Sequence, residues 1–269
     1  MAGHSVNFQT GLRSIMKGDI MVAPLRSYLS SPEFKGFDLK VRGIGERAPD
    51  YYFHPSEHPQ WPVRALWLWM VAPSLIMREP RDPTATLAMT AGSIWHEVVE
   101  RSLLDIGLLV TNEISFSDEA LRSRGKADGL VKEHSGQESP EELFEFKTMK
   151  DMILRQIETL DDFIAKYPTY VMQANEYMRM SGYRKMRFLI MALTFPFDMR
   201  EFVLDYNPQM AHDVETKYRE VHQSIADKRV PMCDGCSQKV HCAARAVCES
   251  ATDEQLHLIV KNAKPLVEA

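Results

Sequence analysis

The residues with the clearest chemical potential in this chain are a carboxylate and an ammonium two positions apart. In residues 143–148, apolar and polar side chains alternate with the period of a β-strand. Phe144 and Phe146 would then lie on one face of the strand. Glu145 and Lys147 would project together from the other face. The pattern therefore predicts a strand whose back is buried and whose front carries an acid beside a base.

A second carboxylate lies in a short apolar stretch upstream. Residues 125–131 have the composition of a strand, and Asp128 is followed by Gly129, which would let another backbone approach closely. Two neighbouring strands could thus present Asp128 and Glu145 to one cation. Taken alone, an aspartate beside a glycine is more often a turn residue, and a Glu-x-Lys pair is more often a solvated edge-strand pair.

An imidazole precedes both strands. Residues 91–107 show helical spacing of apolar side chains and end at a glycine, so we expect a helix that aims His96 at the two acids. Mg²⁺ and Mn²⁺ prefer oxygen ligands, and two carboxylates, one imidazole and a substrate phosphate form a plausible coordination set. Such an ion would activate a bound water, and Lys147 would orient or deprotonate that water.

Two further polar residues follow the strands at helical spacing. A helix is predicted to begin near Pro168 and to end at Gly182, and the i, i+4 spacing of Gln173 and Tyr177 places both on one of its faces. We expect both residues beside the substrate groove and not in the centre of the core.

The order of these elements resembles a known family. Gly92-x3-His96, Asp128-Gly129, Glu145-x-Lys147-Thr148 and Gln173-x3-Tyr177 together resemble the RecB-type branch of the PD-(D/E)XK nuclease superfamily. Within that branch, the chain is most similar to CRISPR-associated and AddB-type nucleases that carry an iron–sulfur cluster, and to their phage-encoded relatives. The resemblance covers roughly residues 50 to 250.

The resemblance implies an α/β fold with a PD-(D/E)XK, restriction-endonuclease-like core, in which helices flank a central mixed sheet. It also implies a divalent cation, Mg²⁺ or Mn²⁺, and DNA as the partner. The matching positions are His96, Asp128 and Glu145 for the metal, Lys147 with Glu145 and Asp128 for catalysis, and Gln173 and Tyr177 for contact with DNA or support of the active site.

All four cysteines of the chain lie in one short stretch, at Cys233, Cys236, Cys242 and Cys248. No signal peptide is evident, which favours a reducing compartment and hence metal binding over disulfides. Thiolates suit zinc or an iron–sulfur cluster. The first three cysteines match the family's cluster ligands in spacing. In the relatives, the fourth ligand lies near the N-terminus, where this chain has Trp61-Pro62 and no cysteine. Cys248 is the natural substitute for that ligand. Both a 4Fe–4S cluster and a zinc ion are compatible with these four cysteines.

Composition is ordinary for a globular protein. The chain has 269 residues, 45% hydrophobic and 26% charged, and a formal net charge of −5 argues against a strongly basic nucleic-acid coat. The longest apolar run, residues 188–197, is too short to span a bilayer and is expected to be a buried strand. We expect no membrane association and a cytoplasmic location in a bacterial or phage-infected host cell.

Three regions are expected: an N-terminal, mostly helical or irregular capping region at 1–90, a nuclease core at 91–230, and a cysteine-cluster segment with a tail at 231–269. The remaining expected elements are a helix at 63–71, a proline-rich stretch at 73–83, strands at 187–195 and 201–206, a helix at 208–228 and a helix after Thr252.

The sequence therefore predicts a metal-dependent DNA exonuclease that acts on single strands or duplex ends, in recombination, repair or phage DNA metabolism. One alternative is a non-catalytic, cluster-stabilised DNA-binding or recombination subunit. Another is a structure-specific endonuclease or an RNase with the same metal chemistry. Assembly into a homo-oligomer is compatible with the family resemblance.

Overall fold

A five-stranded mixed sheet forms the centre of the protein. The computed structural model describes residues 19–38, 50–76, 83–132, 141–195, 197–232, 242 and 244–262. The strands follow one another in the order β1-β2-β3-β4-β5, with β3 and β4 parallel and the other neighbours antiparallel. This confirms the expected α/β class with a mixed central sheet flanked by helices. The strands are β1 (Leu109–Asp118), β2 (Ser123–Val131), β3 (Glu142–Met149), β4 (Lys185–Ala192) and β5 (Met199–Asp205).

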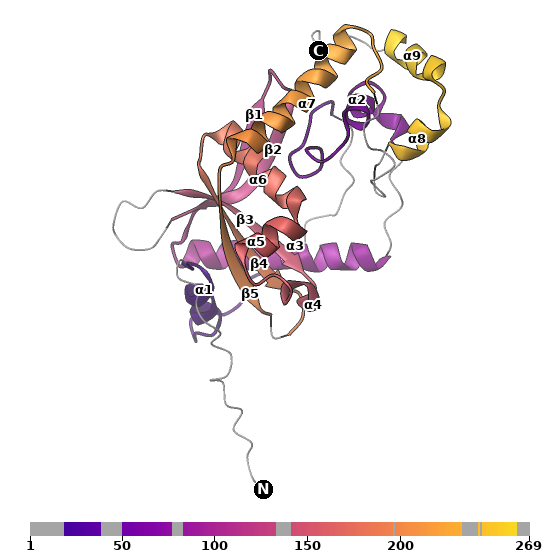
Figure 1. Cartoon of the computed structure of the whole chain (residues 1–269). Helices are drawn as coiled ribbons and strands as arrows, with labels where there is room; N and C mark the ends of the chain where they lie inside the picture. Colours follow the sequence, from indigo (N-terminus) through magenta and orange to yellow (C-terminus); the bar gives the residue numbers. More distant parts are fainter. Residues whose placement is uncertain are drawn as a thin grey trace.

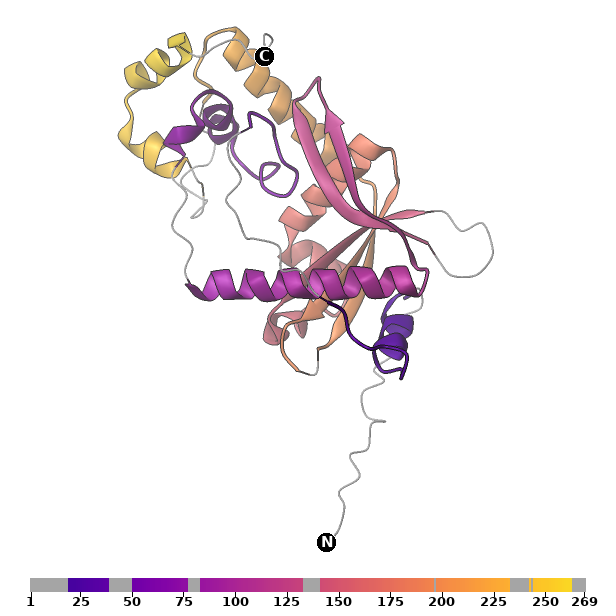
Figure 2. The same cartoon turned by 180° about the vertical axis from the view of Figure 1, so that it is seen from behind.

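Helices cover both faces of this sheet. Figure 1 shows α5 and α6 in front of the strands, and Figure 2 shows α3 crossing the opposite face with α1 at its end. In the described part of the chain, no helix combines the length and the hydrophobicity that crossing a bilayer requires. The helices of these two layers are α1 (Val22–Leu29), α3 (Pro83–Asp105), α4 (Asp151–Leu154), α5 (Leu160–Lys166) and α6 (Pro168–Ser181).

Side chains of β3 alternate between the two faces of the sheet as expected. Phe144 and Phe146 are fully buried against the layer of α1 and α3, where Met21 and Leu25 also pack. Gly129 in β2 allows the close approach predicted for it, because a Cβ at that position would collide with the backbone carbonyl oxygen of Thr111 in β1. The sheet can therefore pack tightly at the position next to Asp128.

Local signals explain the limits of α6. Pro168 occupies the first turn, where its missing N–H costs no hydrogen bond. Gly182 ends the helix with a φ of 81°, a left-handed conformation that glycine adopts without a Cβ penalty. Both ends lie where the sequence predicted them.

A second group of helices lies beside one end of the sheet. α2, α7, α8 and α9 gather there with the loop at 50–61, around a core that includes Trp67, Trp69 and Tyr218 (Figures 1 and 2). Cys242 and Cys248 are half-buried and pack against this core. The predicted ligands Cys233 and Cys236 lie outside the described residues. The bounds are α2 (Val63–Val71), a 3-10 turn η2 (Pro73–Leu75), α7 (Pro208–Ala226), α8 (Arg245–Ser250) and α9 (Asp253–Asn262).

Several predicted bounds were wrong. The helix that carries His96 begins at Pro83 and not near residue 91. Proline suits the first position of a helix, and the additional turns up to Met89 are exposed, so no buried apolar face marked them in the sequence. The apolar run at 188–197 is only partly a buried strand: β4 ends at Ala192, and Phe195 is 86% exposed in the turn before β5. Phe197 in this turn has a φ of 56°, which a strand cannot accommodate. β1, α1, α4 and α5 were not predicted at all.

Candidate active site

The candidate site lies where β2 and β3 separate. The two strands pair only between Gly129–Val131 and Glu142–Phe144, so Asp128 and Glu145 are the first residues beyond the paired region. There the Asp128 Oδ2 atom accepts a hydrogen bond of 2.8 Å from the backbone N–H of Phe146. The carboxylate of Asp128 thus takes the place of the missing strand partner, and it is fixed next to Glu145.

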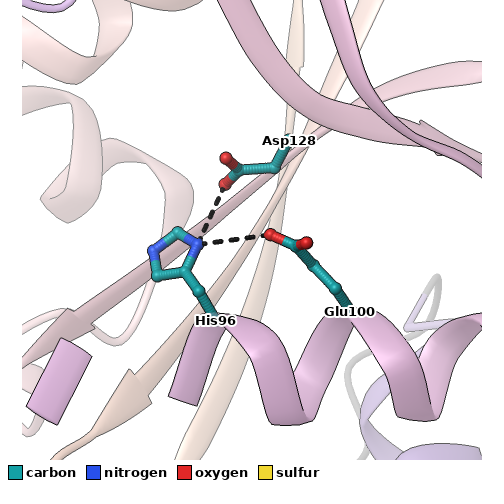
Figure 3. Close-up of side chains that lie close together, drawn as sticks. All are labelled: His96, Glu100 and Asp128. Carbon is teal, nitrogen blue, oxygen red and sulfur yellow. Dashed lines mark ion pairs between the residues drawn. The ribbon is translucent and has the colours of Figure 1, made fainter. Parts of the chain in front are cut away.

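Helix α3 adds an imidazole and a further carboxylate. His96 Nδ1 lies 3.6 Å from Asp128 Oδ2 and 3.6 Å from Glu100 Oε1 (Figure 3). Potential ligand atoms of these three residues all lie within 4.8 Å of one another. The His96 ring is fixed by an edge contact with the Phe146 ring, at a centroid distance of 4.8 Å. Glu100 was missed by the sequence reasoning, although its i, i+4 spacing from His96 is a signal that could have found it.

The carboxylate of Glu145 is held by two donors. Its side chain is buried, and Oε1 accepts bonds of 2.5 Å from Lys147 Nζ and 2.8 Å from the Gln173 amide. The same amide lies 3.3 Å from the Tyr177 hydroxyl, to which it donates. Glu145 Oε2 is buried and has no hydrogen-bond partner among the described residues. One oxygen of this carboxylate is therefore free to bind a cation or a water.

The electrostatics of the site disfavour two ionised carboxylates side by side without a cation. Burial raises the pKa of Glu145 to about 7, and the nearby charge of Asp128 contributes to this rise. Burial also raises the pKa of Asp128, against the opposing effects of His96 and Lys147. Burial by itself would lower the pKa of Lys147, but Glu145 and Asp128 together raise it well above its ordinary value, so the side chain stays an ammonium.

These residues fit a hard divalent cation. Carboxylate oxygens and an imidazole nitrogen are suitable donors for Mg²⁺ or Mn²⁺, and a buried carboxylate oxygen without a partner is costly unless something binds it. The side chains of His96 and Asp128 are 31% and 22% exposed, so the site can be reached from solvent. The residues that would hold the cation are His96, Glu100, Asp128 and Glu145.

The structure brings together all six residues that the sequence assigned to the site outside the cysteine cluster. The prediction for Gln173 and Tyr177 holds only in part. Gln173 contacts Glu145, but both residues are only 3% exposed, and Tyr177 belongs to the hydrophobic core between the sheet and α6. Their burial leaves little surface for contact with DNA.

No protein-family model matches the sequence, and no curated protein matches it. Among solved structures, the chain is similar to that of SSO0001, with a TM-score of 0.44, 13% identity, and coverage of 87% of this chain and 96% of that one. It is also similar to LHK-Exo in complex with dAMP, with a TM-score of 0.42, 14% identity, and coverage of 66% and 89%. A further structure, of the alkaline exonuclease LHK-Exo from Laribacter hongkongensis, has a TM-score of 0.39, 13% identity and the same coverage.

Proposed function

We propose that the protein is a metal-dependent deoxyribonuclease of the RecB-type PD-(D/E)XK branch, which hydrolyses phosphodiester bonds as an exonuclease on single strands or duplex ends. The observation that carries the proposal is the Glu145 carboxylate. It is buried, it is held on one oxygen by Lys147 and Gln173, and its other oxygen has no partner in the described residues. A purely structural carboxylate in such a place would be expected to have both oxygens satisfied.

Each residue of the site has a distinct role in this proposal. The cation, bound by His96, Glu100, Asp128 and Glu145, would activate a water and stabilise negative charge on the phosphate.

Lys147 lies beside Glu145 as an ammonium, so it can donate a hydrogen bond to the attacking water or to a phosphate oxygen. Gln173 and Tyr177 are buried behind Glu145, and we assign them the supporting role, because they fix the direction of its carboxylate.

The first experiment tests hydrolysis itself. Purified protein is incubated with Mg²⁺ or Mn²⁺ and end-labelled linear DNA, and Lys147→Met and Glu145→Gln are compared with the wild type. Each variant should lose about a hundredfold or more in rate, as expected for one positioned catalytic group.

The matched control is Lys126→Met, because Lys126 also pairs with a glutamate from a strand, at 2.7 Å from Glu113, but it lies outside the site. Wild-type turnover in Lys147→Met would refute the assignment.

The same assay separates the alternatives. Degradation of linear but not circular DNA indicates an exonuclease, and cleavage of circles indicates an endonuclease. Preference for RNA would replace the DNA assignment. DNA binding without any hydrolysis in either metal would favour the non-catalytic subunit.

The cysteines support a second, separate proposal. Cys242 and Cys248 lie six residues apart against the core formed by α2 and α7, and the other two cysteines of the chain are Cys233 and Cys236. We infer that the four thiolates bind a 4Fe–4S cluster, with zinc as the alternative. The visible absorption spectrum of freshly purified protein, with iron and zinc analysis, decides between them. Cys236→Ser should lower stability in either case, because metal binding by such a segment contributes folding free energy.

A further inference from the structure

A tyrosine that no sequence motif singled out contacts the ammonium of the site. Lys147 Nζ lies over the ring of Tyr170, 5.1 Å from its centroid. Tyr170 precedes Gln173 by three residues and Tyr177 by seven in α6, so all three lie on one helix face. The face of α6 that carries Gln173 and Tyr177 therefore extends one turn toward the N-terminus of the helix. There it carries Tyr170, which contacts Lys147 of β3.

The Tyr170 ring belongs to a stack of aromatic side chains. Tyr167 stacks on it at a centroid distance of 5.3 Å and an interplanar angle of 9°. Phe163 lies 6.4 Å from Tyr170 and stacks in turn on Phe202 of β5 at 5.2 Å. This stack joins α5, α6 and the sheet. The ring under the ammonium is thus fixed in position relative to β3, on which Lys147 lies.

The position of Lys147 depends on two contacts of different kinds. Its charged partner is Glu145, whose Oε1 atom it contacts at 2.5 Å, and its other close contact is the face of the Tyr170 ring. A divalent cation bound by Glu145 would draw on the same carboxylate charge and weaken the ion pair. The ring face attracts a cation through its quadrupole and is not affected by that competition.

We propose that Tyr170 is the positioning residue for Lys147, and that its ring keeps the ammonium directed at the reaction centre while Glu145 is engaged by a cation. The inference rests on the proposed function, because it assigns Tyr170 a role only if Lys147 acts in hydrolysis. The face of the Tyr170 ring makes the contact with Lys147 and the stacking contact with Tyr167. Phenylalanine should therefore replace tyrosine, whereas an aliphatic side chain of similar size should not.

The kinetic test uses three variants. Tyr170→Leu should lower kcat about tenfold with little change in KM, which corresponds to about 1.4 kcal/mol for a partly desolvated cation–π contact. Tyr170→Phe should stay within about threefold of wild type. The matched control is Tyr206→Leu, which removes a ring from a second cation–π contact, 4.8 Å from the Arg184 guanidinium carbon, without touching Lys147 or the stack behind Tyr170. It should lose stability but keep kcat. Equal kcat values in Tyr170→Leu and wild type would overturn the inference.

A second measurement does not depend on activity. Protons on the ε-carbon of Lys147 lie near the Tyr170 ring face and should be shifted upfield by its ring current in the NMR spectrum. The shift should persist when Ca²⁺, a hard cation with the same ligand preference, is added to the wild-type protein, and it should be absent in Tyr170→Leu. Loss of the shift on addition of Ca²⁺ would overturn the inference, since the ring would then not hold the ammonium when it is needed.

Different outcomes test the proposed function and the role of Tyr170. If the wild-type protein hydrolyses no DNA with Mg²⁺ or Mn²⁺, the proposed function fails, whatever Tyr170 does. If Lys147→Met hydrolyses DNA at the wild-type rate, the catalytic role of Lys147 fails, and the role of Tyr170 fails with it. If Lys147 is required but Tyr170→Leu keeps wild-type kcat, only the positioning role fails.

Discussion

A glycine in β2 allows a sharp test of how the site is supported. A Cβ at Gly125 would lie 2.6 Å from Tyr177 Cε1 and 2.9 Å from Pro55 Cδ. Carbon atoms pack favourably at about 3.5 to 4 Å, so in Gly125→Ala the Tyr177 ring or the Pro55 loop must move by roughly 1 Å. Overpacking of this kind costs about 1 to 3 kcal/mol of unfolding free energy.

The same displacement should reach the Glu145 carboxylate. The Tyr177 hydroxyl is 3.3 Å from the Gln173 amide, already close to the limit for a hydrogen bond, and that amide donates to Glu145 at 2.8 Å. A retreat of the ring by about 1 Å breaks the first contact and frees Gln173 to rotate. Since misplacement by 1 Å can cost up to about a hundredfold in rate, we expect kcat of Gly125→Ala to fall about tenfold or more.

The control is the glycine that ends α6. Gly182 has a φ of 81°, and a Cβ there would have no described atom within 4 Å, so Gly182→Ala should cost about 1 kcal/mol through the backbone alone. Urea unfolding measures the stability of both variants, and cleavage of end-labelled DNA with Mg²⁺ measures their activity. Gly182→Ala should retain wild-type kcat. If Gly125→Ala is equally active, the chain of contacts from Gly125 to Glu145 does not support catalysis, and that reasoning is refuted.

Two further predictions concern the fold away from the site. Glu201 is buried and accepts backbone hydrogen bonds of 3.0, 3.0 and 3.3 Å from residues 20, 21 and 22 at the start of α1, as well as a bond of 2.5 Å from Arg187, which also pairs with Glu142 at 2.7 Å. Glu201→Leu should lose about 2 kcal/mol or more in urea unfolding, because the backbone donors lose their acceptor while Arg187 keeps Glu142 as its partner; unchanged stability would contradict this role. Burial lowers the pKa of His222, against the effect of its contact with the Leu121 carbonyl, so protonation favours the unfolded chain and stability should be lost as pH falls below about 6.5. His222→Gln should flatten the dependence of Tm on pH between about 5 and 7, and parallel curves for variant and wild type would exclude this cause.

The sequence predicted best those elements whose signals are local. α6 was placed correctly at both ends, because Pro168 and Gly182 each fix a backbone angle without help from the rest of the fold. β1 was missed because most of its side chains are exposed, and its alternation of apolar and polar residues is confined to the short stretch from Ile114 to Ser117. The strand is held mainly by pairing with β2.

The site shows the same division. Glu145 and Lys147 could be found from the alternation in one strand. Glu100 could have been found as well, because it lies one helical turn after His96, whereas Glu97 is the next residue and does not share that face. The sequence could not show that the packing of α3 on the sheet brings this face to Asp128. The burial of Tyr177 could not be predicted either, because it depends on the absence of a side chain at Gly125, in a strand more than fifty residues upstream.

Because His96 and Glu100 belong to the same helix, their backbones move together. The two side chains lie one turn apart on α3, whereas Asp128 belongs to the sheet (Figure 3). A shift or rotation of α3 therefore moves both side chains relative to Asp128 together. A single residue inserted between them would rotate one away from the other by about 100°, while an insertion before Ala91 would leave their relative arrangement unchanged. The spacing within this single helical turn, more than the length of the helix, determines whether the two side chains can act together.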